Sequence, residues 1–282
     1  MSDHYPHPFP PPWAEAWGDD RYGLWADLLV KGVTQRMRWL APGRFVMGSP
    51  VTEPGHQSEE SPQHTVTLTE SQWLADTACT QAMWEVVMGS NPSYVTDDPN
   101  KPVEMVSWSD VQDFFGALQT HDVLPAGIEA VLPTEAQWEY ACRAGTVSAY
   151  SFGDTISVKN VNFDHDKNWK KRVDMHQTIV PVKSLPANCW GFYEMHGNVW
   201  EWCADSMRAY AVGNVSNPSG PSGAVGDGSF ELAVRGGAWR GHFRFERSAQ
   251  RSHRSRDKRL NLIGFRFALR SKSEQRTEGS RA

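Results

Sequence analysis

Residues 188–205 read NCWGFYEMHGNVWEWCAD and join three tryptophans to several oxygen-bearing side chains. The tryptophans supply apolar surface for burial, and the oxygens come from Glu194, Asn198, Glu201 and Asp205. Oxygen ligands on a glycine-containing turn suit a hard cation such as calcium better than zinc or copper. The same oxygens could instead accept hydrogen bonds from the turn backbone, and the spacing favours neither role. A second, weaker oxygen-rich stretch contains Asn162, Asp164, Asp166 and Asp174.

Three helices are predicted upstream of this segment, each from a start signal. Thr80 is a candidate N-cap for a helix that Gly89 ends. Ser109 begins one capping-box match and Thr134 begins another. Strands are predicted over 33–40 and 45–49, joined by a Pro-Gly turn, and over 64–77. After residue 145 the chain is rich in Gly, Asn, Asp and Trp, so the sequence predicts one loop-rich α+β domain.

The composition narrows the class of protein. A chain of 282 residues with 39% hydrophobic residues can bury a core. No apolar run approaches the length of a membrane span, and prolines stand where a signal peptide would have its apolar core, so we expect a cytoplasmic protein without membrane contact. The four cysteines lack CxxC spacing, which excludes a zinc ribbon.

Charge is divided unevenly along the sequence. Residues 235–282 contain 12 arginines and two lysines against four acids, a net charge of +10, which leaves −15 on residues 1–234. The basic segment could bind an acidic partner, or its arginines could pair with the acidic remainder of the same fold. Nucleic-acid binding is not expected, because no stacking platform or known reader motif accompanies the charge.

Eight short motifs follow one another along the chain: MGS at 47–49, NPS at 91–93, PVEMVSWSDV at 102–111, LPTEAQWEYACRAGT at 132–146, WGFYEMHGNVWEWCAD at 190–205, RGGAW at 235–239, RSAQR at 247–251 and GFRFA at 264–268. Together they resemble the sulfatase-modifying-factor family, whose founding member is the formylglycine-generating enzyme. The resemblance implies a loop-rich α+β fold of the C-type-lectin-like kind. We therefore expect a Pro-rich arm over 1–31, the domain over 32–270 and a polar tail over 271–282.

The resemblance also implies structural calcium. Matching the calcium-binding members of the family residue by residue points to one site at Glu194, Gly197, Val199 and Glu201. It points to a second site at Asn162, Phe163, Asp174 and His176. Glu194 replaces the shorter Asp or Asn that is usual in the family, so its side chain is longer than the site normally holds.

The family's catalytic residues have no match in this sequence. Formylglycine formation in the family needs two thiolates near the RGG-W segment to hold copper(I), and here the corresponding positions fall at Gly241 and at His242 or Phe243. No cysteine follows Cys203. We therefore expect neither copper nor formylglycine-generating activity and name no catalytic residue. The ten histidines show no helical pairing typical of an iron site, and His196 is expected to be a packed structural residue.

Residues 240–262 are the expected ligand-binding surface. In this fold the loops before the closing GFR strand face ligands, and some family members are variable proteins of diversity-generating retroelements, which vary residues there. The candidate ligand-binding residues are Trp239, Arg240, His242, Phe243, Arg244, Phe245, His253, Arg254 and Asn261. The candidate variable positions also include Gly241, Ser252, Leu260 and Leu262. Framework roles, with guanidinium groups bridging acids or carbonyls, are expected for Arg235, Arg247, Arg251 and Arg266, and for the ring of Trp239.

The sequence thus favours a binding module for a protein or another acidic ligand, displayed on a calcium-stabilised scaffold. The alternative is an oxidative enzyme, formylglycine-generating or related to siderophore maturation, that acts on a peptide or small molecule.

Overall fold

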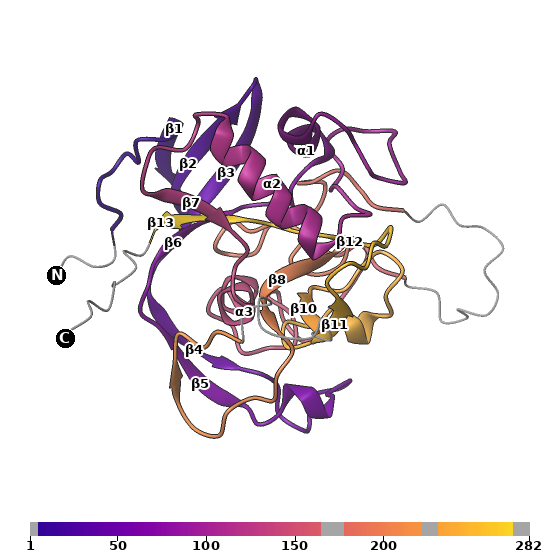
Figure 1. The fold of residues 1–282 in the computed structure, drawn as a ribbon. Coiled ribbons are helices and arrows are strands. Elements are labelled where there is room, and N and C mark those ends of the chain that lie inside the picture. The colour runs from indigo at the N-terminus through magenta and orange to yellow at the C-terminus, as the bar shows by residue number, and fades with distance from the viewer. Residues whose placement is uncertain (1–4, 165–177, 221–230, 273–282) are drawn as a thin grey trace, which may run out of the picture.

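The computed structural model describes residues 5–164, 178–220 and 231–272. Its largest sheet combines strands from the early part of the chain with a strand near residue 270, as Figure 1 shows. In order across this six-stranded sheet lie β1 (Ala14–Asp20), β2 (Gly23–Val30), β3 (Val33–Leu40), β6 (Gln72–Ala75), β13 (Ala268–Ser271) and β7 (Ile128–Val131). The last strand of the chain therefore lies inside the sheet, antiparallel to both of its neighbours.

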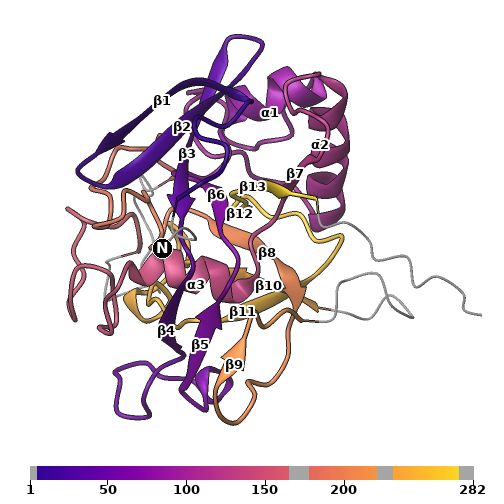
Figure 2. The same cartoon turned by 90° about the vertical axis from the view of Figure 1, so that its left-hand side faces the viewer.

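Two smaller sheets complete the fold. A four-stranded sheet has the order β11 (Ser252–Ser255), β10 (Glu231–Arg235), β8 (Trp200–Ser206) and β12 (Ile263–Gly264). A three-stranded sheet has the order β4 (Gly43–Met47), β5 (His64–Leu68) and β9 (Val215–Ser216). Figure 2 shows β3 continuing into β4, and β5 into β6, so that these segments link the three-stranded sheet to the six-stranded one. Two short 3-10 helices, η1 (Ser58–Glu60) and η2 (Phe243–Phe245), lie in loops.

Three α-helices begin at capped residues. Thr80 caps α1 (Gln81–Met88), and Gly89 ends it in the left-handed conformation, as predicted. Thr134 and Gln137 form the predicted capping box of α3 (Glu135–Arg143). For α2 (Trp108–Thr120) the predicted cap at Ser109 is wrong, because Ser107 caps this helix. No α-helix follows α3 in the described part of the chain, which agrees with the expected loop-rich second half.

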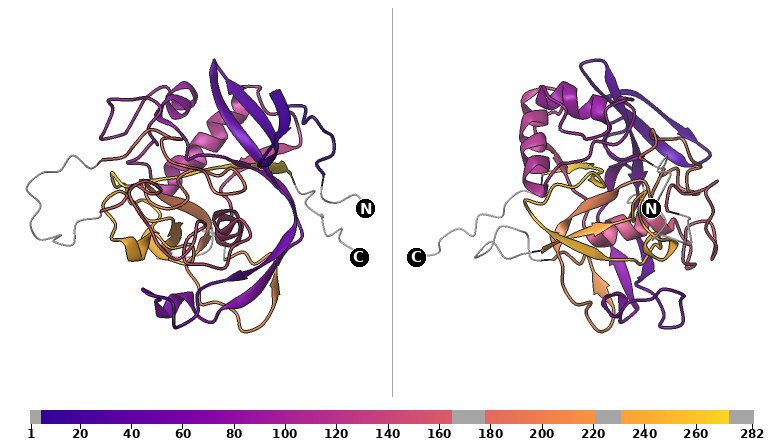
Figure 3. Two further views of the ribbon diagram at one scale, coloured as in Figure 1. Left: turned by 180° about the vertical axis from the view of Figure 1, so that it is seen from behind. Right: turned by 90° about the vertical axis from the view of Figure 1, so that its right-hand side faces the viewer.

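The apolar core lies in two main clusters. The larger one packs α1 and α2 against the six-stranded sheet and includes Trp84, Phe114 and Phe265. The other surrounds α3, which lies near the middle of the molecule in both views of Figure 3 and buries Trp138 completely. The fold is therefore α+β, with much of its backbone in loops around α3.

Two expectations about the first strands are wrong. The predicted arm over 1–31 does not extend so far, because β1 and β2 pair with each other and with β3 as part of the sheet. The Pro-Gly turn does not reverse the chain into a hairpin, since β3 pairs with β2 and β6 whereas β4 pairs with β5. None of the helices over the described residues is long and apolar enough to cross a membrane.

Candidate functional site

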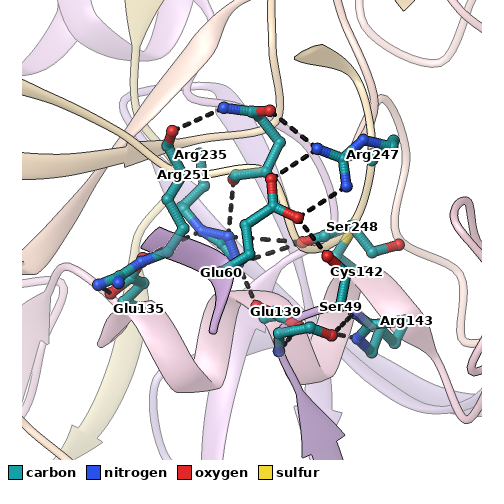
Figure 4. A network of polar contacts seen from close by, with 12 residues as sticks. Ser49, Glu60, Glu135, Glu139, Cys142, Arg143, Arg235, Arg247, Ser248 and Arg251 are labelled. Atoms are coloured by element: carbon teal, nitrogen blue, oxygen red, sulfur yellow. Dashed lines mark hydrogen bonds and ion pairs between the residues drawn. The ribbon is translucent and has the colours of Figure 1, made fainter. Parts of the chain in front are cut away.

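A network of buried arginine and glutamate side chains supports the candidate surface (Figure 4). Helix α3 places Glu135, Glu139 and Arg143 four residues apart and therefore on one face. Burial alone would raise the pKa of Glu139, but the guanidinium groups of Arg143 and Arg235 hold it below its usual value. Both oxygens of Glu135 accept from Arg251, at 2.7 Å each. The acids of α3 thus anchor β10 and the 247–251 segment.

Arg247 extends this network to the loop before β5. Its Nη2 lies 2.5 Å from Oε1 of Glu60, and its Nη1 lies 2.6 Å from Oε1 of Glu53. Its Nε donates to the carbonyl of Arg244, and Nη2 also donates to the carbonyl of Gly55. The arginines expected to be framework residues are thus framework residues, and much of the basic charge of the C-terminal segment is neutralised inside the fold.

Residues 240–245 form a ridge on this framework. Arg240, His242, Arg244 and the two phenylalanines of η2 are exposed, with Phe243 at 37% and Phe245 at 40%. Trp239 differs from the expected ligand contact: it is only 5% exposed, and its indole donates to the carbonyl of Asn261. It therefore belongs to the framework that supports the ridge.

Two hollows are lined in part by the ridge, and together they contain most of the predicted ligand-binding residues. The basic groove encloses about 340 Å³ and is lined by Gln57, Glu59, Trp200, Met207, Ala238, Arg240, Gly241, Phe245, Gln250, Arg251, Ser252, His253, Arg254 and Leu262. The aromatic pocket encloses about 560 Å³ and is lined by Pro50, Glu53, Pro54, Val147, Ser148, Ala149, Tyr150, Asp154, Thr155, Ile156, Phe163, Asp164, His242, Phe243 and Arg247. Both volumes are in the range of small-ligand sites.

The predicted residues divide between these hollows. Arg240, Phe245, His253 and Arg254 face the groove, whereas His242 and Phe243 face the pocket. Arg244 and Asn261 line neither. The pocket walls from residues 147–156 were not predicted from the sequence, because their only signal is a set of apolar residues without helical or strand periodicity.

Glu246 occupies the space beneath the ridge. It is completely buried, its Oε1 accepts from the amide of Ala238, and burial raises the pKa of its carboxyl well above the usual range. A Cβ atom at Gly237 or at Gly241 would overlap the Glu246 carboxylate. Gly241, predicted both as a variable position and as the place of the family's first cysteine, therefore admits no side chain beside Glu246.

The first predicted calcium site has its acids engaged by protein donors. Glu201 binds Arg266 through both oxygens and also accepts from the indole of Trp138. The two oxygens of Glu194 accept from the amides of Lys183 and Leu185. Burial raises the pKa of Glu194 to about 7. As arranged here, these two carboxylates do not fit a calcium ligand set, which requires oxygens directed at a shared ion.

The second predicted calcium site is described only in part. Asp174 and His176 lie outside the described residues. The side-chain Nδ2 of Asn162 donates to the carbonyl of Thr178 and to Oδ1 of Asn198, and Phe163 is buried. No cluster of three or more His, Cys, Asp or Glu that could hold a metal occurs within the ranges given above. Calcium at this site stays a prediction.

Cys142 and His196 are buried, and their surroundings fit a structural role. Burial raises the pKa of Cys142 to about 12 and lowers that of His196 to about 4, so neither ionises near neutral pH. His196 Nδ1 lies 2.6 Å from the carbonyl of Glu246, and its other nitrogen accepts from the amide of Ser151. The expected packed role of His196 agrees with these bonds. None of the cysteines lines the groove or the pocket.

Comparison with known proteins agrees with this architecture. The Sulfatase-modifying factor enzyme 1-like domain model matches residues 29–271. The formylglycine-generating enzyme of Streptomyces coelicolor is 34% identical over 66% of this chain, and that of Mus musculus is 30% identical over 66%. The chain spans only 58% and 50% of the lengths of these two relatives.

Solved structures share the fold over nearly their whole length. Treponema denticola variable protein 1 has a TM-score of 0.71 at 23% identity, covering 86% of this chain and 98% of its own. PvdO from Pseudomonas aeruginosa has a TM-score of 0.69 at 25% identity, covering 91% and 98%. With the matched residues running from β2 to β13, the chain belongs to the sulfatase-modifying factor enzyme 1-like family.

Proposed function

We propose that this protein is a binding module that holds an acidic segment of a partner protein in its basic groove. The observation that carries the proposal is that two arginines of the groove have no acidic partner among the described residues. Arg240 and Arg254 line the groove, and neither forms an ion pair with an acid among the described residues. Arg251, by contrast, is neutralised by Glu135 beneath the groove floor. The two unpaired guanidinium groups can each bind a carboxylate.

The surroundings of these arginines support recognition of a polypeptide. Phe245 is exposed at the groove, and Trp200 and Leu262 provide an apolar floor. Aromatic anchors beside arginines are typical of protein interfaces. The buried network beneath holds the groove in place before binding, which reduces the ordering cost of association. The fold shared with a variable protein supports this use of the scaffold.

Oxidative catalysis is the second candidate, because the relatives in Streptomyces coelicolor and Mus musculus are formylglycine-generating enzymes. The groove lacks the two thiols that a copper(I) centre would need, since no cysteine follows Cys203. Oxygen uptake with a cysteine-containing peptide and added copper tests this candidate directly. Sustained turnover would replace the binding proposal.

Binding is tested with poly-L-glutamate as the probe and poly-L-lysine as its charge opposite. We expect saturable binding of poly-L-glutamate that weakens about ten-fold in Arg240→Ala and in Arg254→Ala. Arg259→Ala is the matched control, because Arg259 is exposed but pairs with Asp110 outside the groove. Equal weakening in all three variants would show only a general charge effect and would overturn the proposal.

The proposal has two finer parts. Diversification by a retroelement would require a near-copy of the sequence encoding 235–266 beside a reverse-transcriptase gene, and inspection of the genome decides this. A cytoplasmic location is the other part, and cell fractionation tests it.

A further inference from the structure

The aromatic pocket is lined by other residues of the ridge than the basic groove and differs from it in charge. Its walls come from four segments: the 50–54 loop, residues 147–156 after α3, Phe163 with Asp164, and the ridge together with Arg247 that follows it. Apolar side chains dominate these walls, among them Tyr150, Ile156 and Phe243. The hydroxyl of Tyr150 donates to the carbonyl of Phe243, which leaves its ring as an apolar surface.

Arg247, the single arginine among the described residues that line the pocket, already has an acceptor for each of its N–H groups. Nε of Arg247 donates to the Arg244 carbonyl, and its two terminal nitrogens donate to the carboxylates of Glu53 and Glu60, to the Gly55 carbonyl and to Gln250. A guanidinium group has five N–H donors, so Arg247 has none to spare for an anionic ligand. It serves to hold the wall of the pocket.

The remaining ionised side chains are acidic. Glu53 and Asp154 line the pocket, where Arg247, the partner of Glu53, is the one positively charged side chain among the described lining residues. Asp154 is exposed and accepts a single 3.3 Å bond from the amide of Ala149. Burial, together with nearby Arg244, lowers the pKa of His242, which favours the neutral form of this ring. The field in the pocket therefore favours a cation.

Exposed apolar side chains lie in and beside the pocket. Val147 and Phe243 line it and are 75% and 37% exposed, and Phe152, which is 40% exposed, lies next to the lining residue Tyr150. Phe152 stacks on Tyr150, with ring planes 2° apart. A cluster of apolar surface beside a concave site is typical of ligand binding. The rings also offer faces that attract a cation.

We propose that the aromatic pocket binds a hydrophobic cation, in which an aromatic or aliphatic body fills the cavity and an amine meets Asp154 at its edge. This site differs in place and charge preference from the basic groove. The cation could be a free amine or the basic side chain of a peptide, and both share this chemistry.

Three ligands with one indole body and different charges test the proposal by calorimetry on the full chain. Tryptamine is expected to bind with a 1:1 stoichiometry, tryptophol to bind more weakly, and indole-3-propionate to bind weakest. The peptide N-acetyl-tryptophanyl-lysine amide separates the two sources: tighter binding than tryptamine indicates a peptide ligand, and weaker binding indicates a free amine. Equal affinity for tryptamine and indole-3-propionate would overturn the proposal.

Variants locate the site. Asp154→Asn keeps the oxygen that accepts from Ala149, and it is expected to weaken tryptamine binding about five-fold while leaving tryptophol unchanged. Ile156→Trp fills the cavity and is expected to abolish binding, with its thermal unfolding midpoint measured to verify folding. Arg254→Ala, in the basic groove, is expected to leave tryptamine binding unchanged and to weaken only poly-L-glutamate. Wild-type affinity for tryptamine in both pocket variants would refute the assignment.

Discussion

Glu201 and Arg266 form a two-point ion pair inside the protein: Nε of Arg266 lies 2.6 Å from Oε2 of Glu201, and Nη2 lies 2.8 Å from Oε1. The pair connects β8 with the segment between β12 and β13. Both side chains are buried, and Arg266 also donates to the carbonyls of Ala75 and Tyr193. The arginine of the GFR motif is therefore a junction between the four-stranded and six-stranded sheets.

Glu201→Gln is expected to lower the free energy of unfolding by about 3–5 kcal/mol, because it leaves a buried guanidinium without its counter-charge. Chemical denaturation measures this change. Glu129→Gln is the matched control, since Glu129 pairs with Arg270 where both side chains are partly exposed, and the expected loss is below about 1 kcal/mol. Equal losses in the two variants would contradict a structural role for the buried pair.

The raised pKa of Glu194 predicts that stability depends on pH. Its folded pKa is about 7, above its usual 4.5, so between these pH values the folded protein holds a proton that the unfolded chain releases. Protonation of Glu194 therefore favours the folded state, and its effect is complete below about pH 4.5. The free energy of unfolding then falls by about 3 kcal/mol as the pH rises through 7. Glu194→Gln should flatten the profile over this window. An unchanged slope in the variant would show that other groups cause it.

The same substitution tests calcium at the 194–201 turn. Both oxygens of Glu194 already accept backbone amides, so we expect Glu194→Gln to contain as much calcium as the parent protein. Atomic emission on dialysed samples measures this content. Loss of one equivalent in the variant would place a calcium ion at this turn, with Glu194 as a ligand.

Gly241→Ala is expected to destabilise the protein by about 1–3 kcal/mol, because the added methyl group overlaps the buried Glu246 carboxylate. Gly116→Ala provides the control: it lies within α2 with no atom near the new methyl group, and the expected effect is a stabilisation of about 0.5–1 kcal/mol. Unfolding midpoints in denaturant report both changes. A neutral Gly241→Ala would mean that Glu246 moves aside easily.

Thiol accessibility predicts how the protein reacts with a disulfide reagent. Cys189 is exposed, whereas Cys79, Cys142 and Cys203 are buried, and burial raises the pKa of each of the three. We expect one equivalent to react in native protein and four in guanidinium chloride, with none in native Cys189→Ser. Rapid reaction of a second thiol in native protein would restore the possibility of a two-thiolate metal site.

Local signals in the sequence predicted the helix boundaries well, with one instructive exception. Thr80 and Thr134 act within three residues, so the sequence alone reveals them. The predicted cap of α2 lies two residues late, because the usual capping box has Glu or Gln at the third helical position, whereas here Asp110 completes the box with Ser107. The first two strands were missed because Pro-rich flanking sequence obscured a pairing that depends on β3.

The sequence predicted those parts of the candidate site that one continuous segment forms. The ridge is such a segment, and the resemblance to the family indicated its position. The aromatic pocket is assembled from residues as distant as Pro50 and Phe243, whose meeting depends on the packing of α3. Likewise, the sequence indicated that Arg235 and Arg247 would pair but could not name Glu139 and Glu60 as their partners.

The position of β13 has a consequence for synthesis of the chain. Until residues 268–271 leave the ribosome, β6 and β7 have no strand between them, and the six-stranded sheet cannot close. Until then the N-terminal strands can pair only among themselves, and the edge of β6 that faces β13 has no hydrogen-bonding partner strand. Such long-range completion favours slow folding. A stop codon just before Ala268 would produce a chain exposed to aggregation, although it retains every residue of the ridge, the groove and the pocket.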